Sequence, residues 1–372
     1  MTLDVVSLAK QLISFPTPSQ VSNESISDFL VDILTDGGCT VERLSYQDES
    51  GVAKVSLVAR KGNGEGGLGL FSHSDTVPAN EEVWSPFLPV VEDGRLIGRG
   101  SCDMKGPLAA TVVAAANADP DRLARPLYVV VTADEEIGFG GARQVMVESR
   151  LLKENMPDHG VVAEPTELVP VYAHKGGMHF MITATGRSAH TSTDRGISAN
   201  LLMAPFLAEM AELAESLRGD ERFRNDEFDP PTNGFNMTID DGGCKLNVTA
   251  AKTVCGLSIR TMPDDHHEEV KDLIEAATQR YGFEFAVRGF EPFYVAQDAP
   301  IVKAALTATG LERAQTVPFG TEALVYQDHL QSVILGPGNI AQAHTVGEWI
   351  DVAQLQRAVD VYEQMIHDLC ED

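Results

Sequence analysis

The chain opens with two stretches in which apolar residues recur at helical spacing. Residues 1–15 form the first stretch, which stops before Pro16 because the position before a proline disfavours helical backbone. In the second stretch apolar side chains recur at three- and four-residue intervals, and two glycines follow it: Ile26, Phe29, Leu30, Ile33 and Leu34. The pattern predicts two amphipathic helices.

Short apolar runs come next, and segments with helical character lie between them. The pattern predicts strands at residues 39–46, 55–62, 67–73, 126–133 and 160–165. It also predicts a small-residue apolar helix over residues 106–118 and a further helix from about Ala142. Continuous apolar strands that alternate with helices are typical of a sheet covered on both faces.

The pattern changes near Lys175, where strands begin to alternate between apolar and polar residues. The predicted elements are strands at 177–186, 235–243, 244–260 and 281–290 and helices at 198–217 and 266–281. This β-α-β-β-α-β order predicts a small open-faced sandwich inserted into the larger domain.

After Pro292 the first pattern resumes, with a helix at 300–310, a strand at 331–338 and a closing helix at 352–369. We therefore expect a discontinuous catalytic domain of residues 1–175 and 291–372. Residues 176–290 form the predicted insertion.

Charge and cysteine content limit the classes of partner and compartment. The net charge of -27 disfavours nucleic acid or an anionic membrane as a partner, because no basic excess offsets phosphate charge. We expect the first stretch to be a helix rather than a secretory signal, and no apolar run approaches the roughly 20 residues that span a bilayer. Five scattered cysteines, none in a CxxC spacing, favour a reducing cytoplasm without a disulfide framework.

Acids and histidines follow several of the predicted strands directly, and one aspartate follows a glycine-containing turn ahead of a helix. These residues are His73 and Asp75 in LFSHSDTVP, Asp103 in GRGSCDMKG, Glu135 and Glu136 in TADEE, Glu164 in GVVAEPTE, and His344 in NIAQAHT. In open α/β sheets ligands gather at the carboxyl ends of strands. Any one of them could be a solvated loop residue or a cap, but together they predict a metal site centred on Asp103. Imidazoles and carboxylates without a thiolate suit Zn²⁺, Co²⁺ or Mn²⁺.

Local spacing separates the expected roles. Residues two apart in extended chain face the same side, so Asp75 can hydrogen-bond the nitrogen of His73 that does not face the metal and so fix its tautomer. Glu135 and Glu136 are neighbours and must point apart, so one can bind metal while the other accepts a proton from water. Cys102 has no paired base, and we do not expect it to be a nucleophile.

The stretches HSDTVP, GRGSCDMKG, TADEE, AEPT and GPGNIAQAH resemble, in order and over nearly the whole chain, the signatures of one family. It is the dinuclear zinc aminoacylase, acetylornithine deacetylase and succinyl-diaminopimelate desuccinylase family. The resemblance implies two divalent ions, Zn²⁺ or alternatively Co²⁺, bridged by Asp103. It assigns His73 and Glu164 to one ion and Glu136 and His344 to the other. It also implies that Glu135 is the general base.

The same resemblance implies a zinc-exopeptidase-like α/β catalytic domain, whose mixed sheet is flanked by helices. The insertion would be a ferredoxin-like α+β domain used for dimerisation, so we expect a homodimer. GRSAHTS resembles a family stretch whose histidine, often from the partner subunit, polarises the scissile carbonyl. This makes His190 an oxyanion-stabilising candidate; the alternative is a surface histidine in a polar loop.

Three further residues are candidates for substrate contacts by resemblance. The run GGCKLNVTAAKTVCGLSIR is similar to a family segment that holds the substrate, which implies roles for Asn247 and for Arg260, the latter as a carboxylate grip. Ala250 stands where proline is usual and Ser258 where aspartate is usual. Thr321, in PFGTEA, stands with the next glutamate where desuccinylases usually carry a Ser-Asp pair.

We expect a cytoplasmic hydrolase that removes the acyl group from an N-acyl amino acid, with N-acetylornithine deacetylation in arginine biosynthesis as the leading interpretation. N-acetylcitrulline deacetylase, succinyl-diaminopimelate desuccinylase and metallo-dipeptidase or carboxypeptidase activities remain open. A non-catalytic protein that binds amino acid derivatives is the alternative class, and such a protein would be expected to have lost the base or a ligand. These motifs give no support to a third class, a purely structural scaffold protein.

Overall fold

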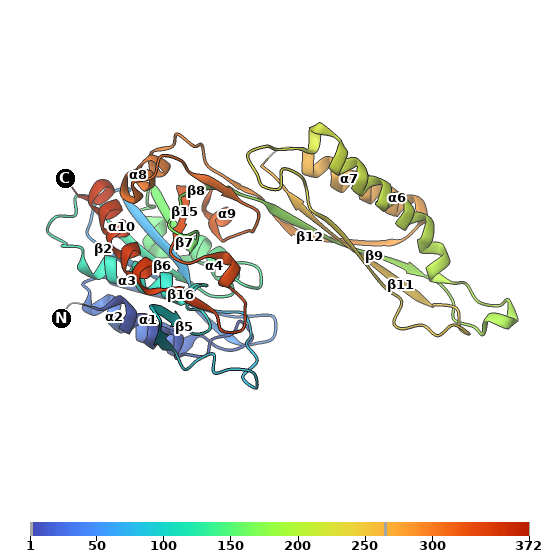
Figure 1. Cartoon of the computed structure of the whole chain (residues 1–372), viewed down its shortest axis with the longest axis horizontal. Helices are drawn as coiled ribbons and strands as arrows, with labels where there is room; N and C mark the ends of the chain where they lie inside the picture. The colour runs from blue at the N-terminus through green and yellow to red at the C-terminus, as the bar shows by residue number, and fades with distance from the viewer. Residues whose placement is uncertain (1–2, 264–265, 372) are drawn as a thin grey trace. The chain divides into compact units, whose positions relative to one another are not determined.

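The computed structural model describes residues 3–263 and 266–371, which divide into two compact units (Figure 1). The first unit contains the chain up to Tyr172, Val295–Gln315, and the chain from Thr321 onward. The second contains Ala173–Tyr294 and Thr316–Gly320. The chain passes between the units within the strands β8 (Val171–His174) and β14 (Gln315–Val317), and again after Tyr294 and after Gly320.

The first unit is an α/β structure. Its helices are α1 (Val5–Ile13), α2 (Glu24–Asp36), α3 (Lys105–Asn117), α4 (Gly140–Glu148), α5 (Arg150–Glu154), α8 (Pro300–Thr309), α9 (Ala323–Tyr326) and α10 (Val352–Cys370). Its remaining strands are β1 (Thr40–Gln47), β2 (Ala53–Lys61), β3 (Leu68–His73), β4 (Val90–Glu92), β5 (Arg95–Ile97), β6 (Leu127–Thr132), β7 (His159–Pro165), β15 (Gln331–Gly336) and β16 (Trp349–Asp351). Among the described residues, no helix is both long and apolar enough to cross a bilayer.

The main sheet has the order β1-β2-β6-β3-β7-β15-β8. Strands β6, β3, β7 and β15 pair in parallel, whereas β1, β2 and β6 pair antiparallel, so the sheet is mixed as predicted. Every residue of β3 and β6 is buried, which requires cover on both faces. Part of that cover is α3, whose small side chains let it pack closely on β3. The prediction of a mixed sheet flanked by helices is confirmed.

The second unit is an antiparallel sheet with two helices on one face (Figure 1). The helices are α6 (Ala199–Gly219) and α7 (His266–Tyr281), and the strands are β9 (Gly176–Thr185), β10 (Phe235–Asp240), β11 (Lys252–Thr261), β12 (Glu284–Phe290) and β13 (Phe293–Tyr294). The four-stranded sheet has the order β10-β11-β9-β12. Alternate side chains of β9 and β11 form one core with both helices. A dimerisation role for this unit stays a prediction.

Two features differ from the sequence-based expectations. Residues 244–251, predicted as the first half of a strand, are irregular, and β11 begins only at Lys252. The preceding glycines have positive φ, and the Asp241 carboxylate accepts amide N–H groups from Gly243 and Cys244, which makes a turn there. The second difference is a three-stranded sheet, β16-β5-β4, whose very short strands carry too few residues to show alternation.

Candidate metal centre

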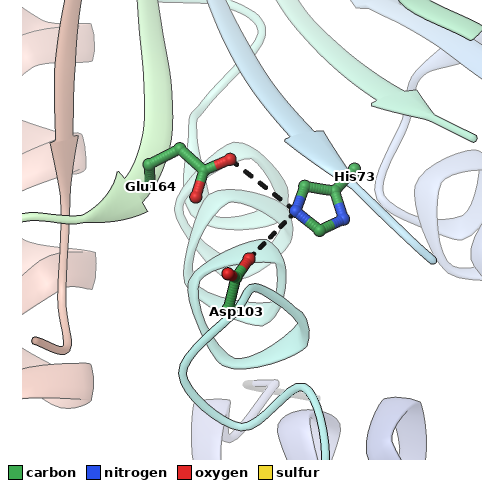
Figure 2. Close-up of side chains that lie close together, drawn as sticks. All are labelled: His73, Asp103 and Glu164. Carbon is green, nitrogen blue, oxygen red and sulfur yellow. Dashed lines mark hydrogen bonds and ion pairs between the residues drawn. The ribbon is translucent and has the colours of Figure 1, made fainter. Parts of the chain in front are cut away.

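Three buried side chains converge where two parallel strands end. His73 is the last residue of β3, Glu164 lies in the neighbouring strand β7, and Asp103 lies in the loop before α3. The Nε2 atom of His73 is 3.1 Å from Oδ1 of Asp103 and 3.6 Å from Oε1 of Glu164 (Figure 2). Their exposed fractions are 0%, 6% and 4% for His73, Asp103 and Glu164. We call these three residues the buried half of the centre.

The second oxygen of Asp103 faces another histidine. His344 Nε2 is 3.2 Å from Oδ2 of Asp103 and 3.2 Å from Oε1 of Glu136. The side chain of His344 is 49% exposed, and its backbone is left-handed with φ of 62°. We call Asp103, Glu136 and His344 the exposed half of the centre. Within each half, one ligand atom from each residue lies within 4.8 Å of the others, as ligands of one ion would.

Asp75 contacts the ring of His73 mainly through its backbone carbonyl oxygen, and its carboxylate has further partners. Nδ1 of His73 lies 3.0 Å from the carbonyl oxygen of Asp75 and 3.5 Å from its Oδ1, so Nδ1 carries the proton and Nε2 is left as the acceptor. The Asp75 carboxylate also accepts the hydroxyl of Ser19 at 2.7 Å and the amide N–H groups of Glu135 at 3.2 Å and Glu136 at 3.4 Å. One carboxylate therefore connects the end of β3 with the turn that follows β6.

That turn separates the two adjacent glutamates. Asp134, directly before them, has φ of 56°, and its carboxylate accepts the Tyr46 hydroxyl at 2.6 Å and pairs with the buried Lys54 at 2.9 Å. Glu136 belongs to the exposed half, whereas Glu135 belongs to neither group of ligands found among the described residues. Burial raises the pKa of Glu135 well above its ordinary value, and the neighbouring carboxylates add to this while His73 opposes it. Glu135 is therefore a carboxyl group suited to accepting and returning a proton.

The electrostatics of the centre fit divalent cations. Burial and the nearby acids raise the pKa values of Glu164 and Glu136, which means that negative charge is crowded here. Hydrogen bonds to Asp103 and Glu136 raise the pKa of His344 to about 10. Carboxylate oxygens and imidazole nitrogens are donors that Zn²⁺, Co²⁺ and Mn²⁺ accept. Burial raises the pKa of the adjacent Cys102 thiol well above its ordinary value, which makes a thiolate nucleophile unfavourable.

The other candidate site residues are His190, Asn247 and Arg260 in the second unit and Thr321 in the first. His190 is exposed in the second unit, and Asn247 is close to it in the fold because His190 and Val248 form a β-bridge. Arg260 is near the far end of β11, roughly 25 Å from the start of that strand at the usual rise per residue, whereas Asn247 precedes that start. Thr321 belongs to the first unit and is completely buried, and its hydroxyl accepts the amide N–H of Ala323 at 3.2 Å.

Two buried acids near the centre were missed. Glu322 accepts the hydroxyl of Thr132, at the end of β6, at 2.7 Å, and burial raises its pKa to about 7. Glu348 accepts the amide N–H of Asp103 at 3.1 Å. Neither follows a predicted strand, so the rule that selected the candidate ligands could not find them.

Comparisons with known proteins agree with this geometry. The model of peptidase family M20/M25/M40 matches residues 69–368. The acetylornithine deacetylase of Myxococcus xanthus is 34% identical over 380 residues, covering 97% of this chain and 96% of that protein. The acetylornithine deacetylase of Proteus mirabilis (strain HI4320) is 32% identical over 381 residues, covering 98% of this chain and 96% of that protein.

Solved structures share the fold at lower sequence identity. Aminopeptidase PepT from Bacillus cereus ATCC 10987 superimposes with a TM-score of 0.74 at 19% identity, over 98% of this chain and 97% of that one. The YXEP protein of Bacillus subtilis, described as a dinuclear metal binding peptidase from the M20 family, has a TM-score of 0.66 at 17% identity, over 98% of this chain and 97% of that one.

Proposed function

Because this chain belongs to peptidase family M20/M25/M40 and is a metal-dependent amidohydrolase, we propose that it removes the acetyl group from N-acetylornithine. The observation that carries the proposal is the placement of Asp103, whose two carboxylate oxygens face two different histidines at 3.1 and 3.2 Å. The names of the relatives support acetylornithine as the substrate. A deacetylase of this kind would act in arginine biosynthesis.

Two divalent ions, Zn²⁺ by preference, are the proposed cofactors. His73 and Glu164 would hold one, Glu136 and His344 the other, and Asp103 both. Bound there, such ions supply a polarised acyl carbonyl and a water molecule that loses a proton near neutral pH. Two donors of the buried half, His73 and Glu164, lie on paired strands, so the positions of these two are fixed before any ion binds.

Proton transfer is assigned to Glu135, which accepts a proton from the attacking water and returns it to the leaving amine. Its carboxyl group is free for this role because the metal-ligand groups do not include it. Asp75 keeps the Glu135 amide N–H and the His73 ring in fixed positions. Asp75 therefore positions both the proposed base, through its carboxylate, and a proposed ligand, mainly through its backbone carbonyl oxygen.

His190 is the proposed donor to the oxyanion of the tetrahedral intermediate. The amide N–H of Ser192 donates to Nδ1 of His190 at 3.3 Å, so the proton of the neutral ring resides on Nε2, which can donate to an oxygen. Asn247, Arg260 and Thr321 are proposed substrate contacts on the resemblance alone. Asn247 precedes the start of β11, and Arg260 lies near the far end of that strand. We therefore also propose a homodimer formed through the second unit and a cytoplasmic location.

A substrate panel tests the proposal. Metal-stripped protein, reconstituted with Zn²⁺ or Co²⁺, is assayed for amine release from N-acetylornithine, N-acetylcitrulline and N-succinyl-diaminopimelate, with a dipeptide and an N-blocked dipeptide as peptidase substrates. We expect the highest kcat/KM for N-acetylornithine and none without metal. Preference for another compound would replace the substrate but keep the enzyme class. Turnover of none, together with binding of an N-acyl amino acid, would favour the non-catalytic binding protein.

A further inference from the structure

The buried carboxylate of Glu348 contacts the backbone of the loop that carries Asp103. Oε1 of Glu348 accepts the amide N–H groups of Cys102 at 3.0 Å and Asp103 at 3.1 Å. Its other oxygen, Oε2, accepts a hydrogen bond from Nη1 of Arg99 at 2.5 Å. Glu348 has no exposed surface, and Arg99 is 3% exposed. Charge-assisted hydrogen bonds of this kind in a buried place hold their partners tightly.

The same residue is fixed to the segment that carries His344. Glu348 follows His344 by four positions and directly precedes β16, which pairs antiparallel with β5. The amide N–H of Gly98 donates to the carbonyl oxygen of Glu348 at 2.9 Å and extends that pairing by one step. The backbone of Glu348 therefore belongs to the segment that carries His344, while its side chain hydrogen-bonds the loop that carries Asp103.

We infer that Glu348 is a positioning residue that sets the spacing between Asp103 and His344, and thereby the affinity of the exposed half for its divalent ion. The inference rests on the proposed two-metal function. The buried half depends on Glu348 much less, because His73 and Glu164 lie on directly paired strands and Asp75 fixes the His73 ring. Loss of the hydrogen bonds that Glu348 accepts should therefore weaken the binding of one of the two metal equivalents.

Three variants separate positioning from simple stability. Arg99→Met breaks the buried ion pair but leaves the Glu348 carboxylate to accept both amide N–H groups. Arg99→Met/Glu348→Met removes that acceptor as well and leaves no unpaired buried charge. Proteins often tolerate the replacement of a whole buried ion pair by apolar side chains. Arg99→Met/Glu348→Gln restores a side-chain oxygen that can accept the amide N–H groups.

The measurement is a titration of each metal-stripped protein with Co²⁺, followed by calorimetry and by the visible absorption of the bound ion. Thermal unfolding of the metal-free proteins records stability separately. Wild-type, Arg99→Met and Arg99→Met/Glu348→Gln should bind two equivalents with affinities within about threefold. Arg99→Met/Glu348→Met should bind one equivalent normally and the second about 10- to 100-fold more weakly, the range for residues that orient metal ligands.

Three outcomes would overturn the inference. Arg99→Met/Glu348→Met could titrate as Arg99→Met does, Arg99→Met alone could lose the second equivalent to the same extent, or the glutamine variant could fail to restore it. If Arg99→Met does not fold, the two double variants still give the comparison. Wild-type protein that does not bind two equivalents would instead overturn the proposed function, so the two failures are distinguishable.

Discussion

The two histidines that face Asp103 have different surroundings. His73 is fully buried at the end of a strand, and Asp75 fixes its ring. The side chain of His344 is 49% exposed on a loop, and the hydrogen bonds of its ring are with Asp103 and Glu136, the other members of its own half. One half of the centre is therefore part of the core of the first unit, while the other half is assembled at its surface. Burial, together with hydrogen bonds from residues that do not themselves face the metal, determines how firmly a ligand side chain is held in place.

Removal of the base is expected to have the largest effect on turnover and leaves both halves in place. Glu135→Gln keeps the size of the side chain but cannot accept the proton, so kcat should fall about 10²- to 10⁴-fold. Calorimetric titration with Zn²⁺ should still show two equivalents, since Glu135 is in neither ligand group. A variant that keeps more than a tenth of wild-type activity would show that Glu135 is not the base. Loss of metal together with activity would make it a ligand.

Removal of one histidine at a time breaks the comparison directly. His344→Ala should keep one equivalent of Co²⁺ at wild-type affinity and bind the other more than about 100-fold more weakly, because a direct ligand contributes more than the residues that orient it. His73→Ala should lose the tighter equivalent and also lower the stability of the metal-free protein, because its buried ring contacts Asp103 and Asp75. Calorimetry and thermal unfolding measure the two effects.

A matched control is His367→Ala, which removes an exposed imidazole of α10 that bonds Glu371 and should leave both equivalents bound. Equal losses in His73→Ala and His344→Ala would contradict the division into a tight and a weak half. The same result would mean that Asp103 alone determines both affinities.

The residues of the buried half were easier to predict from sequence than the residues that hydrogen-bond around the centre. His73 and Glu164 each lie at the end of an apolar run, and the rule that ligands gather at strand ends selected both as candidate ligands. The doubly wound pattern and the β-α-β-β-α-β order likewise follow from periodicity, which records which side chains face a core. Residues 244–251 alternate like a strand yet are irregular, because the Asp241 carboxylate and two glycines of positive φ make a turn directly before them.

Ser19, Glu322 and Glu348 could not be predicted because their roles come from contacts between distant segments. Ser19 reaches Asp75, and Glu322 reaches Thr132, across long stretches of sequence. A serine in a loop or an acid after a glycine has no local signature that separates it from a solvated residue. Their functions depend on where the chain folds back, which periodicity does not specify.

The smallest expected effect concerns the free energy that it costs to bury Glu322 near the metal centre. Glu322 is fully buried, and burial raises its folded-state pKa to about 7, against about 4.3 for an unfolded glutamate. Between these values the folded metal-free protein binds more protons than the unfolded chain. Its free energy of unfolding should therefore fall as pH rises from about 4.5 to 7, and this group contributes about 3 kcal/mol to the fall.

Glu322→Gln keeps the volume and removes the titration, so its urea-unfolding free energy should decline less than that of the wild-type protein over this pH range. The difference between the two proteins should favour the variant increasingly toward pH 7, and it should be measured without metal, since bound cations would hold the glutamate ionised. Glu148→Gln, an exposed position on α4, is the matched control and should leave the slope unchanged. A difference in unfolding free energy between Glu322→Gln and wild type that stays constant across pH would show that Glu322 does not titrate in this range. The burial of acids near the buried half would then cost less free energy than their crowding indicates.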